Sequence, residues 1–277
     1  MEKVSADIHF LEALNKPSIN IPRAALGFAR SIAYPKLDVP AYLARLDALA
    51  DAARPYVQDA GSLTERTDAL STFLFDKMQY RGNHTNYYDP YNSFLNCVLD
   101  RKLGIPITLA VIYVSIAQRV GMRAYGISLP GHFIAGVYEN GSEVLLDPFD
   151  AGRRLTAADC ARLVRDGTGF KGPFQQKWLS PSTPTDVVAR MLTNLCNAYI
   201  QMEDWNSAIP VIQHLLIVQP DAEHHLRNLG YVYLYDGSLR LSADLLEQYL
   251  RRAPKAGDFD SVLNSLKIVA ARLALWN

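Results

Sequence analysis

The chain has 277 residues, of which 49% are apolar and 20% are charged, and its 28 basic side chains are balanced by 28 acidic ones. The apolar fraction is sufficient for one large or two medium cores, which excludes a disordered chain. The charge is balanced in both parts of the chain, with 20 basic and 18 acidic residues before Pro181 and 8 and 10 from it onward. This balance excludes the electrostatic footprint of a nucleic-acid or anionic-membrane binder.

Cysteine usage indicates the cellular compartment. Cys97, Cys160 and Cys196 are too few for a disulfide framework and lack the spacing of a zinc site. The first residues lack a leader pattern, and the apolar run Leu109 to Val114 is too short to span a bilayer. We therefore expect a soluble cytoplasmic protein without a membrane segment, metal or cofactor.

The first part of the chain predicts helices. Pro22 and Pro40 stand where proline opens a helix, and Ser62 with Glu65 forms a capping box before an apolar-periodic run that ends near Tyr80. A short helix is expected over 94–102. A long, unusually apolar helix is expected from Pro106, and such a helix belongs in the centre of a domain.

Strands are expected after Gly121, over 122–129, 132–139 and 142–149. The last two flank Asn140-Gly141, which is the strongest two-residue signal for a hairpin. Thr156 is expected to cap a further helix, and a connector follows. We place a domain boundary near Pro181, so that 1–180 forms an α+β domain and 181–277 an all-α segment.

The second segment repeats itself with a period of 34 residues, which is typical of tetratricopeptide repeats (TPRs). The shift superimposes Asn194-Leu195 on Asn228-Leu229, Tyr199 on Tyr233 and Pro220 on Pro254. We predict two repeats, at about 189–222 and 223–256, and a capping helix from about Phe259 to Trp276.

The hairpin predicts a polar pair. If Asn140 and Gly141 form its loop, paired residue numbers sum to 281, and His132 lies opposite Phe149. Alternation then places His132, Ile134, Asp147 and Phe149 on one face of the sheet. His132 and Asp147 become diagonal neighbours about 7 Å or less apart at their Cβ atoms, within reach of an imidazole–carboxylate hydrogen bond. This pair is the orienting half of a catalytic triad.

The order of elements resembles the transglutaminase-like, or papain-like, fold, in which a cysteine begins the buried helix in the pattern G-x-C-x-x-x-A. Here the stretch is Gly104-Ile-Pro106-Ile-Thr-Leu-Ala110, so that proline takes the place of the nucleophile. Together with the repeats, four segments of the chain carry a further resemblance: Asn92-Ser-Phe-Leu-Asn, Val98-Leu-Asp-Arg-Lys-Leu-Gly-Ile-Pro-Ile, Pro130-Gly-His-Phe and Leu146-Asp-Pro-Phe. They resemble a bacterial SirB-type family, named after an invasion-gene regulator, in which a transglutaminase-like domain precedes TPRs. The resemblance implies this fold with a degenerate site.

Two interpretations of this site remain open. In the first, His132 and Asp147 are a vestigial dyad that closes the hairpin onto the helix. In the second, Cys97 serves as the nucleophile of a cysteine-dependent hydrolase or acyltransferase with His132 and Asp147. Cys97 is expected inside the 94–102 helix, away from its start, and Cys160 and Cys196 at packing positions.

Two candidate binding surfaces follow. The tyrosine-rich loop 83–93 either rims a cleft beside His132 or covers the long helix. The first helix of each repeat presents residues that either hold a peptide carboxylate or pack against the first domain: Arg190, Asn194, Asn197, Arg227, Asn228 and Tyr231. The leading hypothesis is a non-enzymatic scaffold or regulator that binds a protein or peptide partner.

Overall fold

The computed structural model describes residues 7–14 and 19–274. The first six residues and Trp276, the expected end of the capping helix, lie outside the described residues. Contacts divide the described chain into two compact units, 7–191 and 192–274. The expected boundary near Pro181 falls in the connector before helix α8, and the division falls inside α8, between Met191 and Leu192.

The first unit begins with helices whose starts are capped as the sequence predicts. Asn20, Asp38 and Ser62 each accept a hydrogen bond from a backbone N–H in the first turn, and Ser62 with Glu65 completes a capping box. The expected helix up to Tyr80 divides, since its second half is a π-helical segment closed by the Met78 N–H to the Phe73 carbonyl. The helices of this region are α1 (Ile8–Leu14), α2 (Ile21–Ile32), α3 (Val39–Gln58), α4 (Leu63–Ser71) and η1 (Thr72–Lys77).

A long helix occupies the centre of this unit, as its composition predicts. Helix α6 (Pro106–Arg119) is buried from Pro106 to Ala117 and packs against α3 and against strands β3 and β4. It is preceded by the short helices η2 (Pro90–Asn92) and α5 (Leu95–Arg101). Two short parallel strands, β1 (Arg81–Gly82) and β2 (Leu103–Gly104), which the sequence did not predict, tie the start of the tyrosine-rich loop to the residues before α6.

The sheet is a four-stranded antiparallel meander, β3-β4-β5-β6. Asn140 and Gly141 close the hairpin, and the pairs run from Glu139↔Ser142 to Ala135↔Leu146, which confirms the predicted register. The pairing ends there, because the chain leaves the sheet after Asp147 in a 3-10 turn. The expectation of a strand up to Phe149 with His132 opposite Phe149 is therefore wrong. The remaining elements of the unit are β3 (Arg123–Leu129), β4 (His132–Glu139), β5 (Ser142–Asp147), η3 (Pro148–Asp150), β6 (Arg153–Leu155), α7 (Ala157–Thr168) and η4 (Gln176–Leu179).

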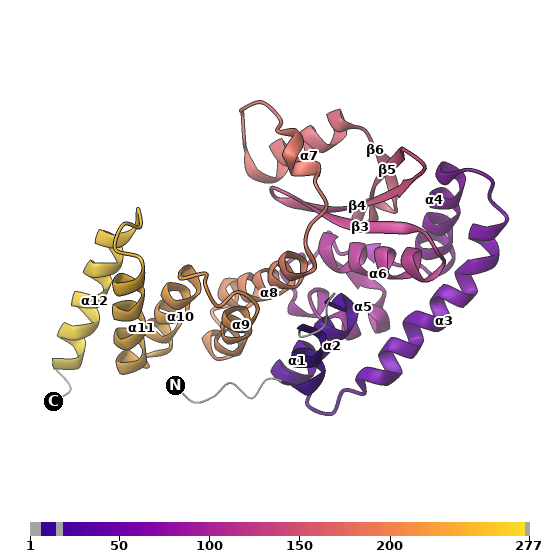
Figure 1. The fold of residues 1–277 in the computed structure, drawn as a ribbon. Coiled ribbons are helices and arrows are strands. Elements are labelled where there is room, and N and C mark those ends of the chain that lie inside the picture. Colours follow the sequence, from indigo (N-terminus) through magenta and orange to yellow (C-terminus); the bar gives the residue numbers. More distant parts are fainter. Residues whose placement is uncertain (1–6, 15–18, 275–277) are drawn as a thin grey trace. The chain divides into compact units, whose positions relative to one another are not determined.

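The two faces of the sheet are covered by different helices. Figure 1 shows α6 on one side of β3 and β4 and α7 on the other. Ile127, Leu129 and Ile134 form a buried cluster with Cys160 and Val164 of α7. Because side chains alternate along a strand, the neighbouring Phe133 points to the opposite face, toward α6.

The elements of the C-terminal segment in the described residues are five helices joined by short turns: α8 (Pro184–Gln201), α9 (Trp205–Val218), α10 (His224–Asp236), α11 (Leu239–Arg252) and α12 (Phe259–Ala274). Helices α9 and α11 begin at residues 205 and 239 and end at 218 and 252, so both ends are offset by 34 residues. A Cβ atom at Gly230 would lie 2.7 Å from the Leu246 side chain, and the Ser242 hydroxyl donates to the Gly230 carbonyl at 2.8 Å. Small residues therefore let α10 and α11 pack closely.

Among the described residues, no helix combines the length and the apolar character that crossing a membrane requires.

Candidate functional site

His132 and Asp147 are hydrogen-bonded, as the hairpin register predicts. His132 Nε2 lies 2.8 Å from Asp147 Oδ2, and the two side chains are 12% and 2% exposed. The second carboxylate oxygen, Oδ1, accepts the Phe149 N–H at 3.0 Å. The carboxylate is therefore held from both sides, and it fixes one nitrogen of the imidazole while Nδ1 remains on the other side of the ring.

Local turns place the two side chains. His132 starts β4 directly after the Pro130-Gly131 turn, in which Gly131 has a φ of +75°. A Cβ atom at Gly131 would lie 2.9 Å from the Gly167 backbone, so the turn fits under the end of α7 only without a side chain. Asp147 ends β5 and caps the 3-10 turn that follows it. Since Ile134 belongs to the cluster under α7, alternation assigns His132 to the α7 side of the sheet.

The start of α6 is built around proline. Pro106 is the first residue of the helix and is buried, and Ile105 precedes it as the N-cap. The Thr108 hydroxyl accepts the Ile105 N–H at 3.1 Å and donates to the Asn92 carbonyl at 2.9 Å. The helix start is thus stabilised by a threonine, and the residue in the position of a transglutaminase cysteine has no nucleophilic atom.

A network of asparagines, which the sequence analysis did not identify, holds the tyrosine-rich loop 83–93. Asn92 is fully buried, accepts from the Asn83 side chain at 3.1 Å and donates to the carbonyls of Asn86 and Tyr87. Asn83 in turn accepts the Asn86 N–H at 3.0 Å. The Thr108 hydroxyl donates to the backbone carbonyl of Asn92 and thereby anchors this asparagine network to the start of α6.

Each of the three tyrosines of this loop is partly exposed and partly buried. Tyr87, Tyr88 and Tyr91 are 39%, 52% and 54% exposed. Tyr87 nevertheless contacts Phe149 edge-on, with ring centroids 6.2 Å apart, and Phe149 in turn meets the ring of His132 at 6.1 Å. We call the surface formed by His84, Tyr87, Tyr88, Tyr91 and Phe149 the aromatic surface.

Charged groups border the aromatic surface. Arg190 of α8 interacts electrostatically with Tyr87, whose pKa is raised chiefly by burial and is lowered in part by this cation. Arg101 lies over the Tyr91 ring, 5.2 Å from its centroid, and pairs with Asp89 at 2.8 Å. Arg190 was predicted as a partner-binding residue on repeat-pattern grounds, and the structure places it beside the tyrosine loop.

Cys97 has its own surroundings. Helix α5 begins at Leu95, so Cys97 lies in the first turn and not in the helix middle as expected. Its thiol donates to the Tyr34 hydroxyl at 3.1 Å and accepts from the Asn96 amide at 3.5 Å, and burial raises its pKa. Among the described residues, no hydrogen bond joins Cys97 to His132 or Asp147. The pocket beside Cys97 includes neither of them and is lined by Tyr34, Asn86, Asp89, Tyr91, Asp100 and Arg101.

The other two cysteines occupy packing positions, as expected. Cys160 is buried under the sheet, and Cys196 is buried in α8. Burial raises the pKa of Cys160 to about 11 and that of Cys196 to about 12. Within the part of the chain that the structure describes, no cluster of three histidine, cysteine or carboxylate side chains is arranged to hold a metal ion.

The residues expected to bind a partner in the helical segment have different surroundings. Asn197 is exposed, and Asn194 and Tyr231 are half-buried. Arg227 forms an ion pair with Asp258 and donates to the Asn228 side chain, so that these two residues contact groups of their own unit. The sequence repeat could not reveal this pairing, because Asp258 lies beyond the second repeat, before α12.

Comparison with known proteins gives matches over most of the chain. Residues 40–193, which include His132, Asp147 and the aromatic surface, match the family model for the transglutaminase-like superfamily. A UPF0162 protein of Xylella fastidiosa (strain Temecula1) is 31% identical over 259 residues, which is 92% of each chain, and a UPF0162 protein of Pseudomonas aeruginosa is 28% identical over 79% of this chain and 86% of its own. F-box only protein 21 of Homo sapiens is 30% identical over 105 residues, or 35% of this chain and 17% of that protein.

Proposed function

Since the chain belongs to the transglutaminase-like superfamily and to the UPF0162 family, we propose that it is a non-catalytic scaffold or regulator that binds a peptide segment of a partner protein. The observation that carries this proposal is the combination of a retained His132–Asp147 hydrogen bond with Pro106 at the helix start. A histidine–aspartate pair without a nucleophile beside it can keep the shape of a substrate-binding site, but it cannot form a covalent intermediate with a substrate.

The aromatic surface supports peptide binding. Its rings connect His132 through Phe149 to the exposed Tyr87 and Tyr88, with centroids 5.3 Å apart between the two tyrosines. Tyrosines bury large areas on binding at small cost in side-chain entropy, and they are enriched at protein interfaces. Arg190 beside Tyr87 favours a peptide that carries a carboxylate next to an apolar side chain.

The helical segment supports a second binding surface. The 34-residue offset of α9 and α11 and the close contact of Gly230 with Leu246 agree with two TPRs followed by a capping helix. Asn194, Asn197 and Tyr231 retain polar groups for a peptide backbone. Arg227 contributes by pairing with Asp258 and donating to Asn228, which holds the shape of this segment.

The cysteine-dependent alternative receives less support. Its nucleophile would be Cys97, whose raised pKa keeps the thiol protonated near neutral pH and whose hydrogen bonds lead to Tyr34 and Asn96. A broad screen of amidase, protease and acyl-transfer substrates decides between the two functions, because turnover abolished by both Cys97→Ser and His132→Ala would establish the enzyme.

Peptide binding is tested by selecting peptides from a random library on the purified full chain and measuring their affinity by fluorescence anisotropy. We expect the double variant Tyr88→Ser/Tyr91→Ser to weaken the selected peptides at least tenfold. Tyr138→Ser is the matched control, because Tyr138 is a 36% exposed tyrosine near the other end of β4. Equal affinity for the double variant and the control would contradict the proposal.

A further inference from the structure

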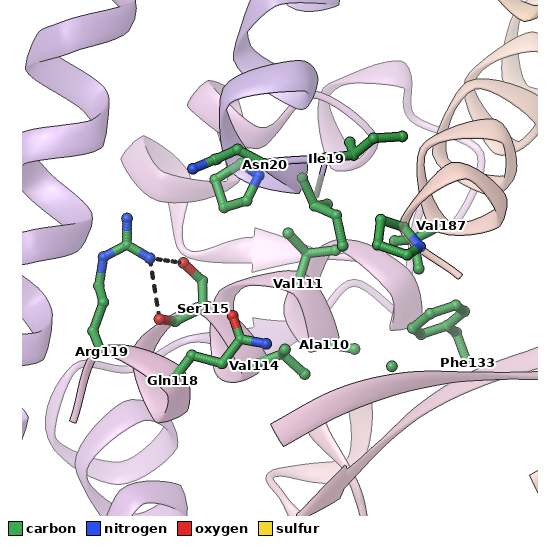
Figure 2. A pocket seen from close by; sticks show the side chains of 14 residues that line it. Ile19, Asn20, Ala110, Val111, Val114, Ser115, Gln118, Arg119, Phe133 and Val187 are labelled. Carbon is green, nitrogen blue, oxygen red and sulfur yellow. Dashed lines mark hydrogen bonds between the residues drawn. The ribbon is translucent and has the colours of Figure 1, made fainter. Parts of the chain in front are cut away.

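A cavity of about 410 Å³ lies in the first unit, on the α6 side of the sheet (Figure 2). We propose that it binds an elongated apolar molecule that ends in a carboxylate, such as a medium-chain alkanoate. The proposal does not rest on the peptide-binding function, since the cavity includes neither His132 nor any residue of the aromatic surface. Four segments line it: residues 19–22 at the start of α2, Gly126 and Phe133 of the sheet, Pro184 and Val187 of α8, and Ala110, Val111, Val114, Ser115, Gln118 and Arg119 of α6.

The volume of the cavity has an identifiable cause. Phe133 lies across β3 at Gly126, where a Cβ atom would come within 2.6 Å of the Phe133 ring. The facing surface of α6 carries the short side chains Ala110, Val111 and Val114, which do not reach across the space. The resulting volume is more than twice the roughly 150 Å³ of an engineered apolar cavity that holds benzene, and it falls in the range of natural ligand pockets.

The two ends of the cavity differ in polarity. Figure 2 shows Arg119 and Ser115 at one end and Phe133 and Val187 at the other, with Val111 between them. The Arg119 side chain is 25% exposed, and Ser115 and Gln118 lie within one helical turn of it; the remaining polar lining residue, Asn20, caps the start of α2. A ligand in this space thus meets polar groups at one end and aliphatic and aromatic carbon at the other.

Hydrogen bonds hold the Arg119 side chain in place and leave some of its N–H donors for a ligand. Its Nε donates to Asp47 Oδ1 at 2.7 Å, and its Nη1 donates to the Ser115 carbonyl at 3.1 Å and to the Ser115 hydroxyl. Its hydrogen bonds to the described residues do not use Nη2, which carries two of the five N–H groups of the guanidinium. Asp47 pairs with the Nε side of the guanidinium, is 64% exposed and does not line the cavity, so Arg119 is the one charged side chain among the lining residues.

The separation of polar and apolar groups between the two ends of the cavity favours one class of ligand. A carboxylate fits an arginine better than an alcohol does, because the hydrogen bond is charge-assisted, and an ammonium group would be repelled. A peptide is disfavoured, since its amides would lie against Val111, Phe133 and Val187, where burial without a hydrogen-bond partner is costly.

Isothermal titration calorimetry of the full chain with hexanoate, octanoate and decanoate tests the proposal. We expect the affinity to rise by about fourfold for each added methylene, as burial of alkyl chain predicts. Octan-1-ol is expected to bind at least tenfold more weakly than octanoate, and octylamine and acetyl-Leu-Leu more weakly still. The absence of octanoate binding, or tighter binding of the amine or the peptide, would overturn the proposal.

Two variants locate the ligand. Val114→Phe fills the cavity and should weaken octanoate at least tenfold, whereas Arg119→Gln should remove the preference for octanoate over octan-1-ol while octan-1-ol still binds. Arg123→Gln is the control for charge, because Arg123 is exposed, stacks on Tyr138 and does not line the cavity. Unchanged octanoate affinity in Val114→Phe with a native circular dichroism spectrum, or the same loss of preference in Arg123→Gln and Arg119→Gln, would contradict the assignment.

Discussion

Two adjacent residues of β4, His132 and Phe133, point to opposite faces of the sheet and have different surroundings there. His132 lies on the α7 side, where it is hydrogen-bonded to Asp147 and Ile134 belongs to a buried cluster. Phe133 lies on the α6 side, where it borders a cavity of about 410 Å³. The comparison teaches that the polar pair is part of a tightly satisfied structure, whereas the space for a small ligand lies on the opposite face.

The largest effect is expected from Asp147→Ala. This substitution removes the acceptor for both His132 and the Phe149 N–H in a buried setting, and it should lower the free energy of unfolding by about 2 to 3 kcal/mol. Urea denaturation measures the change. Asp150→Ala is the control, because Asp150 is 57% exposed in its pair with Arg153 and should cost less than about 1 kcal/mol. Similar losses in the two variants would mean that the pair is not structurally important.

Gly131→Ala should cost about 2 kcal/mol. Its φ of +75° disfavours any L-residue by about 1 kcal/mol, and its Cβ atom would also meet the Gly167 backbone at 2.9 Å. Gly141→Ala separates the two causes, because Gly141 has a φ of +84° and a Cβ atom added there would have no other atom within 4 Å. The difference between the two variants in thermal unfolding measures the close approach alone, and equal losses would contradict it.

A matched pair of phenylalanine substitutions compares the two faces directly. Ile134→Phe adds volume to the packed α7 side, where Ile134 is fully buried, and should cost about 1 to 3 kcal/mol. Val114→Phe adds volume to the cavity on the α6 side and should change the free energy of unfolding by less than about 1 kcal/mol. A larger loss in Val114→Phe than in Ile134→Phe would show that the cavity is not open space.

The smallest signal is expected from thiol labelling. The raised pKa values of Cys97, Cys160 and Cys196 keep the protonated form dominant at neutral pH, so iodoacetamide should label the folded protein slowly and the denatured protein fully. Because the thiolate appears only as pH rises toward each pKa, the labelling rate of the folded protein should rise at a higher pH than that of a free thiol, whose pKa is about 8.5. Mass spectrometry follows the reaction, and rapid labelling of Cys97 at neutral pH would favour the cysteine-dependent alternative.

The sequence predicted the site where short-range rules apply. The Asn140-Gly141 turn determined the hairpin register, and the register brought His132 to Asp147. Proline likewise predicted the starts of α2, α3 and α6, and the capping box of Ser62 and Glu65 predicted that of α4.

The features that the sequence did not predict depend on contacts between distant segments. The anchoring of the tyrosine loop needs Asn92 and Thr108 to meet, and the parallel pair β1–β2 joins residues that are more than twenty positions apart. The cavity depends on Gly126, Phe133 and α6 together, and no local pattern encodes an unfilled volume.

The central claim, that the His132–Asp147 pair serves a non-catalytic binding protein, is tested most directly by assaying the purified protein and His132→Ala with amidase, protease and acyl-transfer substrates. The account predicts no turnover above background for either protein, with selected peptides still bound by the wild type. Turnover by the wild type that His132→Ala abolishes, while the variant keeps its native fold, would contradict it.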